Sequence, residues 1–214
     1  MSNIQNTKEM KELVSNQTAS QQTQEEQPMA EVMTLQEILD AYGSELDGNP
    51  SVYCGTYRKY NEGSIFGAWL DISKFSDYDE FIDVCRQLHA DEEDPELMFQ
   101  DYEGFPSSLY CESCMGEDTF DKILEYAKLD DKEQEAFDDY LDLGHDFDIE
   151  RFREAYCGNW DSEEDFAQDI IDSCYDIEKT MGSLSSYFDY EAFARDLFMC
   201  DYQMGANNNV FRVL

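Results

Sequence analysis

Basic side chains are scarce in this sequence: 14 Lys and Arg stand against 50 Asp and Glu in 214 residues, a net charge of −36. Binding of nucleic acid and docking on anionic lipid both need clustered Lys and Arg, so this composition argues against both. No apolar run approaches the roughly 18 residues that a membrane span needs. The opening residues Met1–Ile4 lack the basic start of a secretion signal. We therefore expect a cytoplasmic protein with no membrane and no direct nucleic-acid partner.

The motifs of common enzymes are also lacking. There is no phosphate-binding Gly-x-x-x-x-Gly-Lys, no Gly-x-Ser-x-Gly turn, no His-Glu-x-x-His helix and no twelve-residue calcium loop. A catalytic triad would have to use His89 or His145, and neither lies in a recognisable motif. We predict a protein that is not an enzyme, with no cofactor and no metal.

The seven cysteines are an odd number, and in a reducing cytosol they are expected to be free, mostly buried thiols. Cys111 and Cys114 have the spacing of zinc ligands, but a structural zinc site needs four ligands and no second matching pair follows. Cys157 or His145 could complete such a site in space. Ordinary loop cysteines are the preferred interpretation, with zinc as the alternative.

Carboxylates are what the sequence has in excess, and they concentrate between residues 77 and 176. These 100 residues hold 34 Asp or Glu and six Lys or Arg, a net charge of −28. Acidic runs are usually solvated or disordered. Here, however, apolar residues such as Phe81, Cys85 and Leu88 recur at helical spacing. We therefore expect the carboxylates to lie on folded helices.

Caps, turns and apolar periods predict an α+β fold. The predicted strands are 51–57, 64–72 and 97–103, with a closing hairpin of 198–203 and 210–214. Five helices are predicted from apolar periods: 31–42, 119–128, 131–143, 149–156 and 190–197. Two more are predicted from capping boxes: one begins at Ser76 and Asp79 and runs to about residue 89, and the other begins at Ser162 and Asp165. The predicted domains are a largely disordered N-terminal extension (1–50, with the helix 31–42), an α/β domain with a short antiparallel sheet (51–108), a helical domain (109–150) and a second α/β domain (151–214).

A fixed array of carboxylates repels itself, which makes physical sense when the array faces something positive. Duplex DNA carries one charge per roughly 1.7 Å of axis, so 28 charges correspond to about 48 Å of duplex. Proteins that bind DNA could then bind this chain instead. The acidic surface predicted to bind such a partner consists of Asp77, Asp79, Glu80, Asp83, Asp121, Glu125, Glu133, Asp138, Asp139, Asp142, Glu163, Glu164, Asp165, Asp169, Asp172 and Asp176.

Several segments resemble the ArdA family of antirestriction proteins. They are Tyr57-Arg58-Lys59-Tyr60-Asn61-Glu62-Gly63 with Gly67 and Trp69, Gln100-Asp101-Tyr102-Glu103, Tyr156 to Trp160 with Ser162 to Ala167, Asp189 to Leu197, and Val210-Phe211. The resemblance covers about residues 51 to 214 in one order with similar spacings. Residues 1–50 extend beyond the usual start of the family, so the resemblance says nothing of their role.

The resemblance implies an elongated chain of three small domains and a DNA mimic carried by mobile genetic elements. Such a mimic occupies the DNA-binding subunits of type I restriction-modification enzymes and inhibits restriction and, in many members, methylation. It also implies a homodimer, and we expect dimerisation through residues 151–214. A dimer is also expected because one chain alone is too short to fill the DNA path of such an enzyme. The alternative is an acidic chaperone or cation-buffering protein that binds basic partners without a DNA-like charge pattern.

Overall fold

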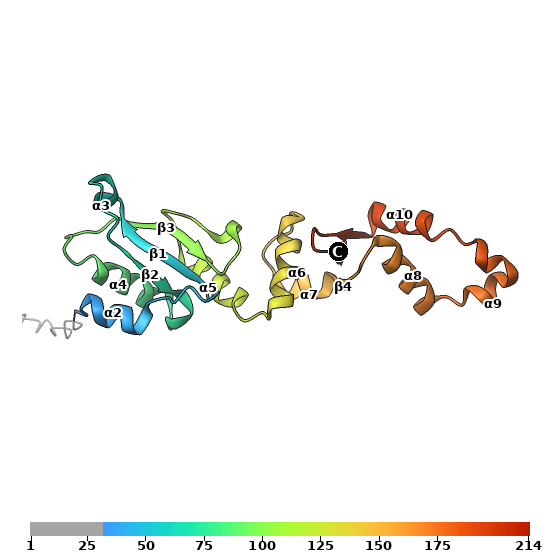
Figure 1. The fold of residues 1–214 in the computed structure, drawn as a ribbon, viewed down its shortest axis with the longest axis horizontal. Coiled ribbons are helices and arrows are strands. Elements are labelled where there is room, and N and C mark those ends of the chain that lie inside the picture. Colours follow the sequence, from blue (N-terminus) through green and yellow to red (C-terminus); the bar gives the residue numbers. More distant parts are fainter. Residues whose placement is uncertain (1–31) are drawn as a thin grey trace, which may run out of the picture. The chain divides into compact units, whose positions relative to one another are not determined.

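The computed structural model describes residues 32–214, so most of the N-terminal extension predicted to be disordered lies outside the described residues. The predicted helix 31–42 was wrong at its start, because the helix begins at Leu35 with Thr34 as its N-cap. Helices and strands are mixed along this part of the chain, which confirms the α+β class (Figure 1). Within residues 32–214, every helix is too short or too polar to span a membrane. In chain order the elements are α2 (Leu35–Tyr42), β1 (Ser51–Thr56), α3 (Tyr57–Asn61), β2 (Ala68–Asp71), η1 (Ile72–Lys74), α4 (Tyr78–Leu88), β3 (Leu97–Glu103), η2 (Ser107–Leu109), α5 (Glu117–Tyr126), α6 (Asp131–Asp142), α7 (Ile149–Ala155), β4 (Tyr156–Asn159), α8 (Glu163–Cys174), α9 (Ile177–Met181), η3 (Gly182–Tyr187), α10 (Tyr190–Cys200), β5 (Tyr202–Met204) and β6 (Asn209–Arg212).

The first sheet is antiparallel with the strand order β2-β1-β3, as Figure 1 shows. Strands β1 and β3 confirm the predictions 51–57 and 97–103 to within one residue. The prediction 64–72 was wrong at its start, because the strand begins only at Ala68. The chain first forms the short helix α3, and Gly67 then passes so close to β1 that a Cβ there would lie 2.4 Å from the Cys54 carbonyl oxygen.

Both outer edges of this sheet are covered by neighbouring segments. Beside β2, the Ser44 N–H donates to the Trp69 carbonyl at 3.0 Å. Beside β3, the Phe99 N–H donates to the Glu112 carbonyl at 2.8 Å, and the Tyr110 hydroxyl donates to the Phe99 carbonyl at 2.6 Å. An uncovered edge strand is a template for pairing with other chains, so these segments protect the sheet.

Helices α4 and α5 close the core over the first sheet. The ring of Phe81 on α4 lies 5.7 Å from that of Phe99 on β3 and 5.5 Å from that of Phe120 on α5, and all three side chains are buried. Burying one such ring contributes about 1.5–3 kcal/mol. Helix α5 therefore packs on the first sheet's core, and the predicted helical domain 109–150 stays a prediction.

The start of α4 differs from the predicted capping box. Asp77 is the N-cap, and its carboxylate accepts a hydrogen bond from the Glu80 N–H at 2.9 Å. Ser76 lies one residue outside the helix and instead donates to the Glu80 carboxylate. The predicted cap of α8 is confirmed, since the Ser162 hydroxyl accepts from the Asp165 N–H at 3.1 Å.

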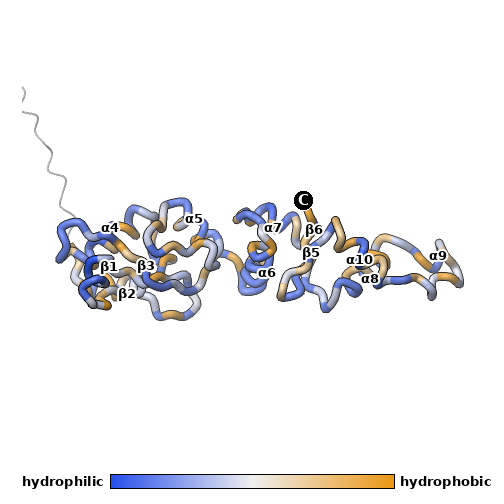
Figure 2. The backbone as a smooth tube through the Cα atoms, turned by 90° about the horizontal axis from the view of Figure 1, so that it is seen from above, coloured by the Kyte–Doolittle hydropathy of each residue, from blue (hydrophilic) through white to orange (hydrophobic). Residues whose placement is uncertain are grey.

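A second aromatic core joins α6, α7 and β6. The rings of Phe137 and Phe152 lie 5.1 Å apart, the rings of Tyr140 and Phe211 lie 5.5 Å apart, and all four side chains are buried. Figure 2 shows the corresponding pattern along the chain, with short hydrophobic stretches alternating with hydrophilic ones. The boundaries at residues 108 and 150 stay predictions, although α6 shares this core with the C-terminal strand.

The second sheet has the order β4-β6-β5 and is also antiparallel. Strand β4 was missed, because its four residues Tyr-Cys-Gly-Asn carry neither alternation nor β-branched side chains. The predicted strand 198–203 was wrong in its first half, where α10 continues to Cys200 and strand β5 begins at Tyr202.

The cysteines differ from the expected set of buried free thiols. Cys111 and Cys114 form a disulfide, their Cα atoms 5.4 Å apart, within the usual span for such a bond. Both sulfurs are thus bonded to each other, and neither is a thiolate ligand for zinc in this state. Of the five free cysteines, Cys174 and Cys200 are exposed.

Candidate functional site

Most residues of the predicted acidic surface are exposed in the structure. Of its 16 carboxylates, 12 are exposed, Glu80, Glu133 and Asp138 are half-buried, and Asp139 is buried. The exposed ones lie on or next to α4, α5, α6, α8 and α9. The sequence therefore predicted the exposure of most of these residues correctly, and their binding role stays a prediction.

Eight of the exposed carboxylates have no partner within residues 32–214. Their side chains make neither a hydrogen bond nor an ion pair there. Of the other four, Asp83 pairs with Arg86 at 3.7 Å, Asp77 and Asp176 cap helices, and Asp165 accepts a 2.6 Å hydrogen bond from the Ser162 hydroxyl. We call these eight the free acidic set: Asp79, Asp121, Glu125, Asp142, Glu163, Glu164, Asp169 and Asp172.

Helix caps explain how the chain folds despite its charge. Asp130, Asp148 and Asp189 accept hydrogen bonds from backbone N–H groups at the starts of α6, α7 and α10. Carboxylates at helix N-termini also interact favourably with the helix dipole, typically by about 0.3–1 kcal/mol each. Part of the acidic excess therefore stabilises helices, including α6 and, through the Asp77 cap, α4, which both carry members of the free acidic set.

Asp139 is a correction to the predicted surface, because its side chain is only 1% exposed. Its carboxylate accepts hydrogen bonds from the Asn207 N–H at 3.0 Å, the Asn207 side-chain amide at 3.0 Å and the Asn209 side-chain amide at 2.9 Å. A Cβ at Gly205 would lie 2.5 Å from this carboxylate. Asp139 thus ties α6 to the β5–β6 turn and is not available to a partner.

Glu80 and Glu133 also have structural partners. The Glu80 carboxylate accepts a 2.6 Å hydrogen bond from the Tyr42 hydroxyl, which joins α2 to α4, and this bond together with those from Ser76 lowers the pKa of Glu80. Glu133 accepts from the Arg153 guanidinium at 3.0 Å. Both residues therefore help to hold the helices in place.

Asp138 is half-buried and incompletely satisfied. One carboxylate oxygen accepts from the Tyr126 hydroxyl at 3.2 Å, while the other is buried without a hydrogen-bond partner. Burial raises the pKa of Asp138, and repulsion from Asp142 and Asp139 adds to the rise, while the Tyr126 hydrogen bond opposes it. The folded chain therefore binds this proton more tightly than the unfolded chain does.

Replacing Asp138 by Asn is expected to stabilise the fold at neutral pH. Above the raised pKa the ionised carboxylate opposes folding, and below the unfolded pKa that penalty disappears. The gain should be at most about 1 kcal/mol, since an amide still leaves one buried polar group unpaired. Urea unfolding should show the gain shrinking as the pH falls from neutral to about 4, near the pKa of the unfolded chain. Asp142→Asn, which changes an exposed neighbour, is the control. A gain that is the same at both pH values would contradict this account.

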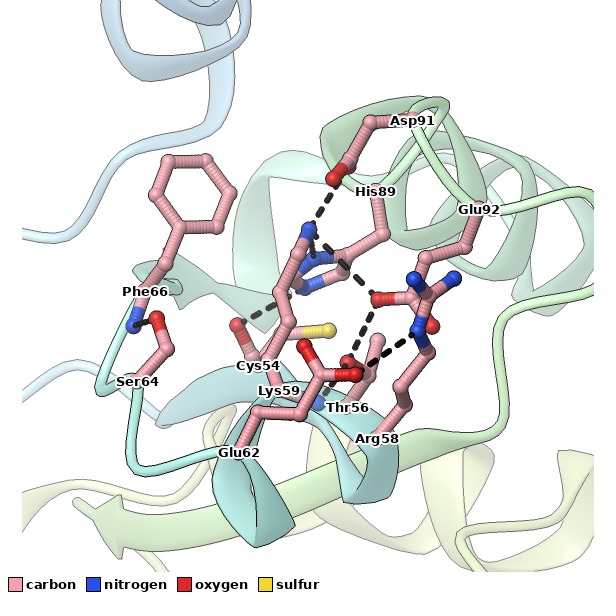
Figure 3. A network of polar contacts seen from close by, with 10 residues as sticks. All are labelled: Cys54, Thr56, Arg58, Lys59, Glu62, Ser64, Phe66, His89, Asp91 and Glu92. Atoms are coloured by element: carbon pink, nitrogen blue, oxygen red, sulfur yellow. Dashed lines mark hydrogen bonds and ion pairs between the residues drawn. The ribbon is translucent and has the colours of Figure 1, made fainter.

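A partly buried ion network around Lys59 of α3 was not found from the sequence (Figure 3). The Lys59 ammonium lies 2.6 Å from an Asp91 oxygen, 3.0 Å from His89 Nδ1 and 3.5 Å from a Glu92 oxygen. Glu92 also accepts from the Thr56 hydroxyl at 2.7 Å. The residues lie some 30 positions apart in sequence, so local pattern could not connect them. The only signal was that Lys59 and its neighbours matched a family segment.

The network determines the tautomer of His89, whose side chain is fully buried. Because an ammonium can only donate, Nδ1 accepts from Lys59 and Nε2 carries the hydrogen that faces the Cys54 carbonyl at 3.3 Å. The ligand atoms of His89, Asp91 and Glu92 lie within 4.8 Å of one another, which is close enough for a metal ion. The Lys59 ammonium contacts all three, so an internal cation already balances the group.

Replacing Lys59 by Met should therefore destabilise the fold by about 1–2 kcal/mol, because Glu92 would keep only its Thr56 hydrogen bond in a buried position. Urea unfolding measures the change. Arg58→Met is the matched control, since the Arg58–Glu62 pair is more than half exposed and should contribute little. Equal effects of the two substitutions would contradict the role given to Lys59.

Comparison with known families gives one match. A protein-family model described as antirestriction protein (ArdA) matches residues 52–212. No curated protein matches the chain. The match covers both sheets, the helices of the free acidic set and the Lys59 network.

Proposed function

Because the chain belongs to the ArdA family of antirestriction proteins, we propose that it acts as a DNA mimic that occupies the DNA-binding subunits of type I restriction-modification enzymes. The observation that carries this proposal is the free acidic set: eight exposed carboxylates on folded helices, with no ion-pair partner among residues 32–214. Such an array attracts the positive surface that an enzyme builds for DNA phosphates.

The mechanism needs no chemical step. Electrostatic attraction speeds the encounter, and carboxylates fixed on folded helices favour surfaces whose positive groups match their arrangement. The occupied enzyme cannot receive duplex DNA, so both cleavage and methylation are expected to be inhibited. In this account the chain works as an inhibitor in the cytoplasm.

The plating of an unmodified phage on a host with an active type I restriction system tests this function. Expression of the chain should restore plating. In a separate binding assay with purified enzyme, higher salt should weaken the interaction between the chain and the enzyme. We expect an affinity loss of at least about tenfold between about 50 and 200 mM salt. Unchanged plating with soluble chain present, across several type I systems, would contradict the proposal.

We also propose that the chain forms a homodimer through residues 151–214. This region exposes several large apolar side chains: Tyr175, Leu184, Tyr187 and Met199 are 59–82% exposed. Apolar groups that one copy leaves in water can be covered by the same groups of a second copy around a two-fold axis.

Sedimentation at micromolar concentration tests the dimer. The unaltered chain should sediment as a dimer, and the double change Leu184→Glu with Tyr187→Glu should shift it toward monomer. Ile65→Glu is the control, because Ile65 is 80% exposed but lies in the first sheet's region. A monomeric unaltered chain, or an equal shift by the control, would argue against this interface.

A further inference from the structure

The Cys111–Cys114 disulfide closes a four-residue loop that carries none of the residues of the predicted acidic surface. Cys114 is exposed and Cys111 is half-buried, so one sulfur of the bond belongs to a residue at the surface. The bond joins residues only three positions apart, and a disulfide stabilises a fold less when it closes a short loop. Its effect is therefore expected to be local.

The loop makes specific contacts with the first sheet. The Glu112 carbonyl accepts from the Phe99 N–H at the outer edge of β3, and the Glu112 carboxylate accepts from the Tyr57 hydroxyl at 3.0 Å. Just beyond the loop, the Met115 carbonyl accepts from the Tyr78 hydroxyl at 2.9 Å, and the Met115 side chain is buried. The disulfide thus restrains the segment that covers this edge.

We propose that Cys111–Cys114 is a thiol–disulfide exchange site for low-molecular-weight thiols of the glutathione class, and that opening the bond loosens residues 110–116 over the edge of β3. This proposal does not depend on the antirestriction function. Helix α5 follows directly, and its N-cap Gly116 makes no side-chain cap hydrogen bond.

The exchange is balanced in two steps. A thiolate of the small thiol attacks Cys114 Sγ, the bond to Cys111 Sγ breaks, and Cys111 leaves as a thiolate that takes a proton from water. A second small thiolate attacks the mixed disulfide, releases the oxidised small disulfide and leaves Cys114 as a thiolate. The protein gains two electrons, which two small thiols supply. An oxidised small disulfide reverses both steps.

The first experiment treats the whole chain with reduced glutathione, labels new thiols with an alkylating reagent and maps them by mass spectrometry. Cys111 and Cys114 should become labelled, while the buried Cys54 and Cys85 should stay protected. Hydrogen exchange at the Phe99 amide and in residues 110–116 should accelerate by about five- to tenfold, as expected when one hydrogen bond no longer restrains the segment. Exchange in α8 should not change.

The variant Cys111→Ser with Cys114→Ser should show the accelerated exchange without glutathione, and Cys174→Ser, which alters an exposed free thiol, should not. Two results would overturn the proposal: a bond that glutathione does not open in the folded chain, or an opened bond with unchanged exchange in residues 110–116. The glutathione experiment on the unaltered chain decides between these outcomes even if the double variant does not fold.

Discussion

A chain whose free acidic set is neutralised should lose nearly all of its ability to protect unmodified phage. The change replaces all eight residues by their amides, Asp by Asn and Glu by Gln. Exposed carboxylates are worth at most about 1 kcal/mol each, so at about 0.5 kcal/mol each the set supplies about 4 kcal/mol, or about a thousandfold in affinity. Any one of the eight substitutions alone should change affinity by less than about fivefold. Plating efficiency and titration with a purified type I enzyme measure both effects.

The control keeps the charge and changes its arrangement. It combines the eight amides with Glu at eight exposed neutral residues outside the apolar patch proposed for the dimer, namely Ala41, Asn61, Ala90, Ser107, Ser108, Gln168, Ser173 and Ala206. DNA mimicry predicts that this rearranged chain inhibits poorly, whereas an acidic chaperone or cation-buffering protein would keep its binding. Equal inhibition by the rearranged and unaltered chains would favour that alternative.

Replacing Asp139 by Ala should destabilise the fold by about 3 kcal/mol, the largest loss that we expect from one carboxylate. The change leaves the buried Asn209 amide and both Asn207 donors without their acceptor, and unpaired buried donors cost about 1–3 kcal/mol each where water cannot reach them. Asp139→Asn keeps the shape and should cost less. Urea unfolding followed by circular dichroism measures the loss.

Asp142→Ala is the control for this prediction. Asp142 lies three residues further along the same helix, is exposed and makes no side-chain hydrogen bond within residues 32–214, so its loss should stay within about 0.5 kcal/mol. Equal losses in the free energy of unfolding for Asp139→Ala and Asp142→Ala would contradict the stabilising role given to the link between α6 and the β5–β6 turn.

The sequence predicted correctly those helices and strands whose ends are marked by residues close by in the chain. Strand β3 and helix α6 were correct to within one residue, because a charged loop with Pro95 precedes β3, and Asp130 and Gly144 flank the apolar period of α6. Strand β4 was missed because it exists only by pairing with β6, more than 50 residues later. The disulfide was missed because a reducing compartment was expected, and because the sequence says nothing of how a turn places two sulfurs.

The candidate site shows the same division. Exposure of ten carboxylates followed from helical periodicity, since they lie on helix faces away from the apolar stripe, and the exposed Asp77 and Asp176 are helix caps. Asp139 could not be told from Asp138 and Asp142 by sequence, because its burial depends on two asparagines some 70 residues away. The Lys59 network likewise needs α3 and the end of α4 to meet in space.

Competition for a purified type I restriction-modification enzyme tests the central claim most directly. The enzyme is first loaded with a fluorescent duplex that carries its recognition site, and the chain is then titrated in while fluorescence anisotropy reports the bound duplex. DNA mimicry predicts that the chain displaces the duplex completely, at a stoichiometry set by the enzyme's DNA sites, and that added salt weakens the displacement. A stable complex that holds enzyme, duplex and chain together would contradict the claim.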